Sequence, residues 1–143
     1  MNLNIDALEA SFDHIAVRGD ELVETFYERL FTRVPAVRPL FAGTDLKRQK
    51  AMLLATLVLL RRSLRDLESV TPKLRDLGER HVRYGALPEH YPIVGEVLIA
   101  SMAEVAGHAW TLEYELAWAE ALAVVSAAML DGAKSVATVS VES

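Results

Sequence analysis

The sequence predicts a single all-α domain. Apolar residues recur at helical steps of three and four along most of its 143 residues, and strict apolar–polar alternation is confined to 135–141. Seven glycines and five prolines are too few for a turn-rich β-sandwich. With 52% hydrophobic and 24% charged residues, the chain can bury one sizeable core and is not of the disordered class.

The first two helices are indicated by apolar rows. Asn4 can cap a first helix because its side chain accepts hydrogen bonds from free backbone N–H groups. Gly19 and Asp20 end this helix and begin the second. The apolar face of the first helix carries Ile5, Leu8, Phe12 and Ile15, and the two rows of the second carry Leu22, Phe26 and Leu30, and Val23, Tyr27 and Phe31.

A short turn and a long helix follow. Pro35 and Pro39 limit the next segment to a short helical turn. Asp45 is a good N-cap for a helix over 46–67. This helix is apolar nearly all round over 52–60, which predicts that other helices cover it on both sides.

A short helix comes next. Thr71 followed by Pro72 is typical of an N-cap and a first helical position. This helix is expected to end at Gly85, since glycine is the common residue just after a helix. A further helix starts at Pro88 or Pro92.

That helix runs to Gly107, and Thr111 caps the last one. After Gly132 the chain is small and polar, with scattered valines. We therefore expect a folded domain over 1–133 and a flexible tail or linker over 134–143.

Several functions are excluded by composition. The chain has no cysteine, which removes disulfides, thiolate zinc sites, cysteine nucleophiles and thioether-linked cofactors. A net charge of -5 argues against nucleic-acid binding. The first ten residues contain Asp6 and Glu9 but no basic residue, unlike a signal peptide, and the longest apolar stretch, within 51–60, has about half the length of a membrane span. We expect a cytoplasmic protein that binds neither nucleic acid nor membrane.

His81 is the first candidate site residue. It lies in an apolar helical stripe with Leu74, Leu77 and Tyr84. An imidazole that faces a core needs a partner for each ring nitrogen. The residues alone leave two interpretations open: a core histidine bonded to a backbone carbonyl, which is the commoner case, or a ligand of a metal or haem. Tyr27 is similar, because its ring falls between apolar rows and its hydroxyl needs a partner.

The arrangement of these residues resembles the globin family, and within it the bacterial single-domain haemoglobins and the globin domain of flavohaemoglobins. The segments that carry the resemblance are Phe26-Tyr27, Pro35, Pro39-Leu40-Phe41, the run LGERHVRYG at 77–85 and HYPIVG at 90–95, and together they cover most of the chain from Phe26 to Trp118. The resemblance implies a three-over-three helical sandwich with a short or absent D helix.

The resemblance also implies a cofactor and its contacts. Haem b would be held without a covalent bond, with His81 as the proximal iron ligand and the sixth iron position open. Tyr27 would be the distal residue, whose hydroxyl stabilises the partial negative charge of oxygen. The other implied haem contacts are Phe41, Met52, Leu77, Tyr91 and Val94.

Two positions depart from the family. The distal position of the third long helix is usually His or Gln; an ungapped alignment places Arg48 there, and a shift of one residue places Gln49 there. We favour Arg48, which would pair with a haem propionate, because the same register puts Met52 over the haem. The glutamate that flavohaemoglobins carry late in the last helix falls near Ala133, and the closest acid is Asp131, which predicts weaker electron donation to the iron.

The expected function is reversible binding of oxygen and of other diatomic gases, carbon monoxide and nitric oxide. One alternative is a nitric oxide dioxygenase that draws electrons from a separate reductase. Another is a gas-sensing globin module of a longer signalling protein, and a third is a globin-fold stress module without haem. The sequence leaves open whether the chain acts alone or as a homodimer.

Overall fold

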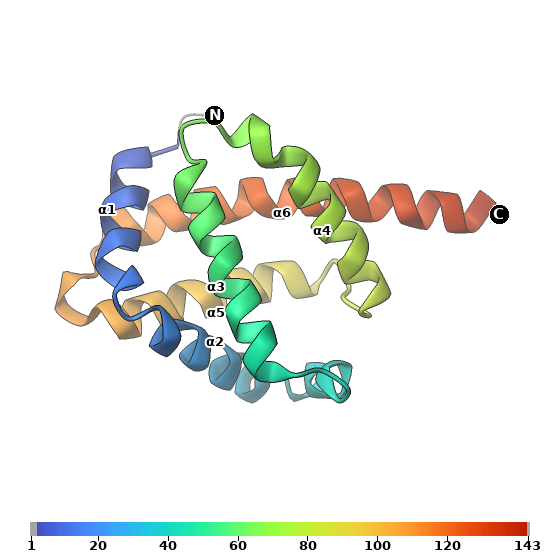
Figure 1. The fold of residues 1–143 in the computed structure, drawn as a ribbon, viewed down its shortest axis with the longest axis horizontal. Coiled ribbons are helices and arrows are strands. Elements are labelled where there is room, and N and C mark those ends of the chain that lie inside the picture. The colour runs from blue at the N-terminus through green and yellow to red at the C-terminus, as the bar shows by residue number, and fades with distance from the viewer. Residues whose placement is uncertain (1–2, 143) are drawn as a thin grey trace.

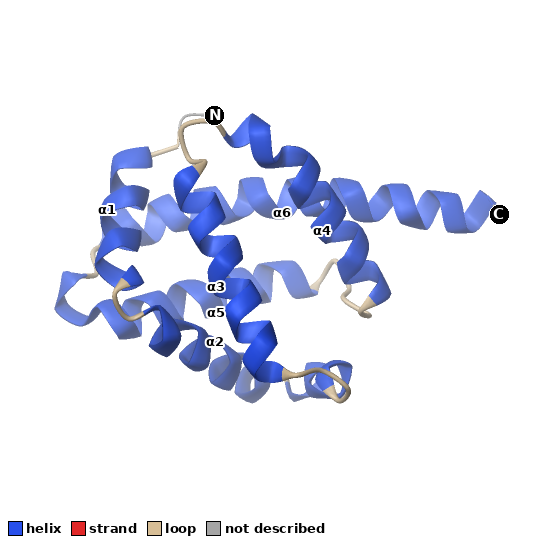
Figure 2. Cartoon of the chain, viewed as in Figure 1, coloured by secondary structure: helices blue, strands red, loops and turns tan. Residues whose placement is uncertain are grey.

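The computed structural model describes residues 3–142, and the side chains of 3–135 (Figure 1). These residues form six α-helices and three short 3-10 segments and contain no strand, so the all-α prediction is confirmed (Figure 2). The α-helices are α1 (Ile5–Ala16), α2 (Gly19–Arg33), α3 (Leu46–Arg62), α4 (Thr71–Arg83), α5 (His90–Ala106) and α6 (Leu112–Glu142), and the 3-10 segments are η1 (Pro35–Phe41), η2 (Leu67–Val70) and η3 (Gly107–Ala109).

Most of the predicted caps are present. The side chains of Asn4 and Thr111 each accept a hydrogen bond of 3.2 Å from the backbone N–H three residues later. Asp45 accepts one of 3.0 Å from the backbone N–H two residues later. Thr71 is not a cap, because it is the first residue of α4 and its hydroxyl donates to the carbonyl of Leu67, 3.2 Å away.

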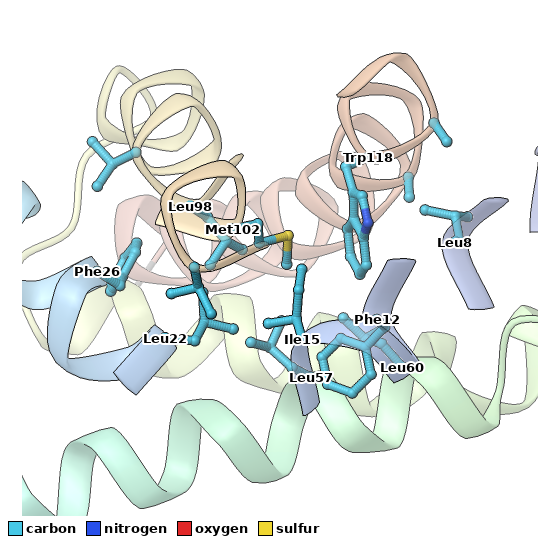
Figure 3. Close-up of a cluster of buried hydrophobic side chains, with 14 of the residues drawn as sticks. Leu8, Phe12, Ile15, Leu22, Phe26, Leu57, Leu60, Leu98, Met102 and Trp118 are labelled. Atoms are coloured by element: carbon cyan, nitrogen blue, oxygen red, sulfur yellow. The ribbon is translucent and has the colours of Figure 1, made fainter. Parts of the chain in front are cut away.

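The core lies where α1, α2, α3, α5 and α6 meet (Figure 3). Its most deeply buried members include Leu8, Ile15, Leu22, Leu57 and Met102. Trp118 of α6 joins it to α1, since its Nε1 donates a hydrogen bond of 2.8 Å to Ser11 Oγ and its ring lies 6.3 Å from that of Phe12. Trp118 therefore has a structural role.

α3 is less covered than the sequence predicted. It packs against α1 and α2 and buries Leu57 and Leu60, and it ends at Arg62 rather than at 67. Met52 in its first half is 45% exposed. The prediction that helices cover this segment on both sides is wrong for that half.

The last helix runs on beyond Gly132, the residue after which a flexible tail was expected. α6 continues to Glu142 and projects past α4 (Figure 1). Gly132 lies inside α6 and faces α4 so closely that a Cβ atom there would overlap the carbonyl oxygen of Arg75. No proline follows to stop the helix. A linker role for 134–143 stays a prediction, and residue 143 lies outside the described residues.

One part of α6, Leu112–Ser135, is long and apolar enough by length and composition to cross a membrane. In the fold this part packs against α1, α4 and α5. It contributes Ala117, Trp118 and Ala121 to the core. Its apolar composition is thus used at least in part for packing within the domain.

Candidate functional site

His81 lies in the last turn of α4 and is partly buried. Its Nδ1 is 2.8 Å from the carbonyl oxygen of Leu77, one turn earlier. Because a carbonyl can only accept, Nδ1 carries the proton and the lone pair is on Nε2. Burial lowers the pKa of His81 below its ordinary 6.5, against a smaller opposing effect of the Leu77 bond, so the ring is neutral at pH 7. Nε2 can therefore bind a metal.

Among the residues that the structure describes, His81 does not belong to a cluster of metal-binding side chains. No group of three or more His, Cys, Asp or Glu side chains could hold an ion there. Structural zinc needs four protein ligands, and catalytic zinc three. A single imidazole suffices when a tetrapyrrole fills the other in-plane positions, as in haem proteins. The donor set fits haem and does not fit a bare metal ion.

Tyr27 of α2 is buried in an aromatic cluster. Its ring lies 5.0 Å from that of Phe26, 6.0 Å from that of Phe31 and 5.9 Å from that of Phe41 in η1. Burial raises the pKa of Tyr27 above its ordinary 10.0, so the phenol keeps its proton. The side chain can therefore act as a hydrogen-bond donor at neutral pH.

Gln49, and not Arg48, lies beside Tyr27. The Gln49 side chain lies near the Tyr27 phenol and offsets part of the rise in its pKa, whereas Arg48 is exposed. This position favours Gln49 over Arg48 as the neighbour of Tyr27, and which of the two would face a bound ligand stays a prediction. The pairing of Arg48 with a propionate stays a prediction.

The helical faces of α3 explain this difference. Gln49 precedes Leu53 by four residues and Leu57 by eight, so the three share one face. Leu57 is buried and Leu53 packs against the core. Arg48 precedes Met52 by four residues, and both are exposed. Counting back along the buried face would have identified Gln49 from the sequence.

The other predicted contact residues are less buried than Tyr27. Phe41, Leu77, Tyr91 and Val94 are partly buried and pack against the core, whereas Met52 is exposed. Further apolar side chains are exposed in η1, at the end of α4 and just after it, namely Leu40, Val82 and Leu87, which the sequence analysis did not single out. Helices α3 and α4, which carry Met52 and Val82, do not pack closely together. Exposed apolar side chains such as these are of the kind that contact a flat, largely apolar group.

In the described part of the chain, no carboxylate hydrogen-bonds to His81 or contributes to the shift in its pKa. The ring of His81 lies 6.5 Å from that of Tyr91, and the pKa of Tyr91 is raised by burial alone. Asp131, the acid nearest in sequence to the family's glutamate position, pairs with Arg75. His81 is therefore oriented by the Leu77 carbonyl, a neutral acceptor.

An all-α fold with a partly buried, ligand-competent imidazole and an aromatic cluster around a buried phenol is compatible with a haem-binding class of protein. The Globin family model matches residues 24–129, and the chain belongs to the globin family. The globin fold class is thereby confirmed, and family membership implies a haem cofactor.

The relatives include flavohemoproteins of several organisms. The flavohemoprotein of Rhizobium meliloti (strain 1021) is 34% identical over 118 residues, which cover 81% of this chain and 29% of that protein. That of Bacillus subtilis (strain 168) is 28% identical over 131 residues, covering 90% of this chain and 33% of that protein. The chain thus spans about a third of the length of these relatives.

Two solved structures share the fold. An engineered carbene transferase from an assumed nitric oxide dioxygenase of Rhodothermus marinus is 27% identical, with a TM-score of 0.86 and coverage of 94% of each chain. A bacterial globin from Campylobacter jejuni is 22% identical, with a TM-score of 0.81 and coverage of 94% of this chain and 96% of that one. The second likeness concerns the fold alone.

Proposed function

We propose that this chain is a cytoplasmic globin that holds haem b without a covalent bond and binds oxygen, carbon monoxide and nitric oxide reversibly. His81 is the proximal iron ligand and Tyr27 the distal donor. The observation that carries the proposal is the hydrogen bond from His81 Nδ1 to the Leu77 carbonyl, because it leaves Nε2 unprotonated. Membership of the globin family supports it.

Bound haem supplies a ferrous iron whose sixth position takes a diatomic gas. The chain supplies the setting for that chemistry. Leu77 fixes the tautomer and orientation of His81, a second-shell bond typical of ligating histidines. The aromatic cluster around Tyr27 excludes water, so a hydrogen bond from its phenol to a partly negative ligand counts for more than it would in solvent.

Nitric oxide dioxygenation is the second candidate function. It is supported by the flavohemoprotein relatives and by the assumed activity of the Rhodothermus marinus protein. Turnover would need electrons from a separate reductase. His81 donates its hydrogen bond to the neutral carbonyl of Leu77 and not to a carboxylate. This favours reversible binding over dioxygenation, because a neutral acceptor adds no negative charge to the proximal ligand. A gas-sensing module of a larger protein is the third candidate.

One spectrum tests the proposal. The purified chain is mixed with haem and its absorption is recorded in the ferric state, the ferrous state and the ferrous state with carbon monoxide. A Soret band that shifts with each state is expected, and a ferrous protein without carbon monoxide should be five-coordinate. A chain that takes up no haem contradicts the proposal. Nitrate formed at many equivalents of nitric oxide per haem, once a reductase is added, would favour the dioxygenase.

A further inference from the structure

Helices α4 and α6 cross with two glycines at the contact. A Cβ atom at Gly78 of α4 would overlap the carbonyl oxygen of Met129 and lie 2.7 Å from its Cα. A Cβ atom at Gly132 of α6 would overlap the carbonyl oxygen of Arg75 and lie 2.8 Å from its Cα. This is the most extensive helix–helix contact in the described part of the chain.

This closeness distinguishes the crossing from the surroundings of the other glycines. A Cβ atom at Gly95 in α5 would meet Leu122 Cδ1 at 3.9 Å, and one at Gly43 would meet no atom within 4 Å. At Gly19 the nearest atoms belong to the flexible tip of Leu54. At Gly78 and Gly132 the atoms that a methyl group would meet belong to the backbone of the other helix. Room for the methyl group would therefore require that helix to move.

Glycine has no local reason to occupy either position. Neither residue has a positive φ, and in a helix interior alanine is favoured over glycine. A packing reason is therefore the physical explanation of both. Because they come from different helices and meet at one crossing, each lets the other helix's backbone approach.

The crossing lies next to the candidate ligand. Gly78 follows Leu77, whose carbonyl holds the His81 ring, and precedes His81 by one helical turn. The ion pair of Arg75 with Asp131 spans the same crossing. A displacement of α4 at Gly78 would move Leu77 and His81 together.

We propose that Gly78 and Gly132 are positioning residues that fix the place of α4 against α6 and thereby the place of His81 Nε2. The inference rests on the proposed function, in which His81 binds the haem iron. An added methyl group at either glycine separates the backbones and tilts α4.

The test compares Gly78→Ala and Gly132→Ala with Gly95→Ala, a helical control that has room for the methyl group. Resonance Raman spectroscopy of the ferrous, haem-loaded protein reports the iron–imidazole stretching band. Both crossing variants should shift this band and lose haem roughly tenfold faster or more, the size expected for overpacking, whereas Gly95→Ala should do neither. Crossing variants that are less stable but keep the wild-type band would overturn the proposal, since that is the result of a merely structural role.

A second variant decides the matter if neither crossing variant folds. The chain has no cysteine, so Arg75→Cys/Asp131→Cys forms a disulfide between α4 and α6 only where their Cα atoms lie within about 7 Å. We expect the disulfide to form and the oxidised protein to lose haem several-fold more slowly than the reduced one. Failure to form it, or equal rates of haem loss in the two forms, would overturn the proposal.

The haem-free chain separates this proposal from the proposed function. Nuclear magnetic resonance of the labelled imidazoles reports the Nδ1 proton of His81 without any cofactor. A wild-type chain that binds no haem would contradict the proposed function. In that case, an Nδ1 signal that moves in Gly78→Ala and not in Gly95→Ala still supports the positioning role, and a signal unchanged in both overturns it.

Discussion

The Nδ1 atom of His81 lies 2.8 Å from the carbonyl oxygen of Leu77, four residues earlier on the same helix. A carbonyl oxygen has two lone pairs, so this one can accept from the helix backbone and from the imidazole together. The ring is thus oriented by its own helix and needs no distant partner. Its Nε2 keeps the lone pair that an iron ligand requires.

Replacing His81 by Ala should strongly weaken haem retention, because it removes the axial bond while leaving the rest of the site in place. Added imidazole should restore part of the Soret band by occupying the vacated position. The measurement is haem loss to an acceptor protein, followed by absorption. His108→Ala is the matched control, since His108 is exposed, and it should behave as wild type. A His81→Ala protein with an unchanged ferrous spectrum would falsify the assignment.

Local signals in the sequence predicted most of the fold. Asn4, Asp45 and Thr111 cap helices because a side-chain oxygen next to free N–H groups needs no information from elsewhere in the chain. The contact of Gly132 with α4 could not be predicted, since a close approach by a helix distant in the sequence leaves no local signal.

The candidate site was predicted less completely. His81 and Tyr27 stood out as polar residues in apolar rows, and the structure buries both at least in part. The segment 52–60 was expected beneath other helices and Met52 against haem, and Met52 is exposed. The apolar pattern alone does not tell whether a face packs against protein or against a ligand. An ungapped alignment could not choose between Arg48 and Gln49, because it ignores which face of α3 is buried.

Replacing Tyr27 by Phe should speed oxygen dissociation by roughly tenfold to a hundredfold, the equivalent of a charge-assisted hydrogen bond of about 1.5–3 kcal/mol. Carbon monoxide release should barely change, since its outer atom carries less negative charge. Stopped-flow measurement of both rates is the check, with Tyr114→Phe on α6 as the control. Equal acceleration for both gases would point to a steric role, and no effect on either would place Tyr27 outside the site.

The haem-free protein should lose stability as the pH falls through about 6.5, the ordinary pKa of histidine. Burial lowers the pKa of His81 in the folded chain, so the unfolded chain takes up this proton first as the pH falls. The free energy of unfolding therefore decreases through 6.5 and levels off below the folded pKa. Urea unfolding between about pH 8 and pH 5 measures it. His81→Gln should make the free energy of unfolding nearly independent of pH in this range, whereas His108→Gln should keep the wild-type dependence. A wild-type dependence in His81→Gln would show that His81 is not its source.

Gln49 and Arg48 should differ in what they control. Gln49 lies beside the Tyr27 phenol, where its amide can orient that phenol or donate to a ligand itself, so Gln49→Ala should change oxygen dissociation by up to about tenfold, the equivalent of one neutral hydrogen bond. Because the two side chains lie near each other, Tyr27→Phe/Gln49→Ala should change the rate by less or more than the product of the single effects. Arg48→Ala should leave oxygen dissociation unchanged and speed haem loss, since its exposed guanidinium can reach a propionate and keep its charge in water. The opposite pattern, with oxygen release altered by Arg48→Ala and not by Gln49→Ala, would restore the ungapped register and move the distal position by one residue.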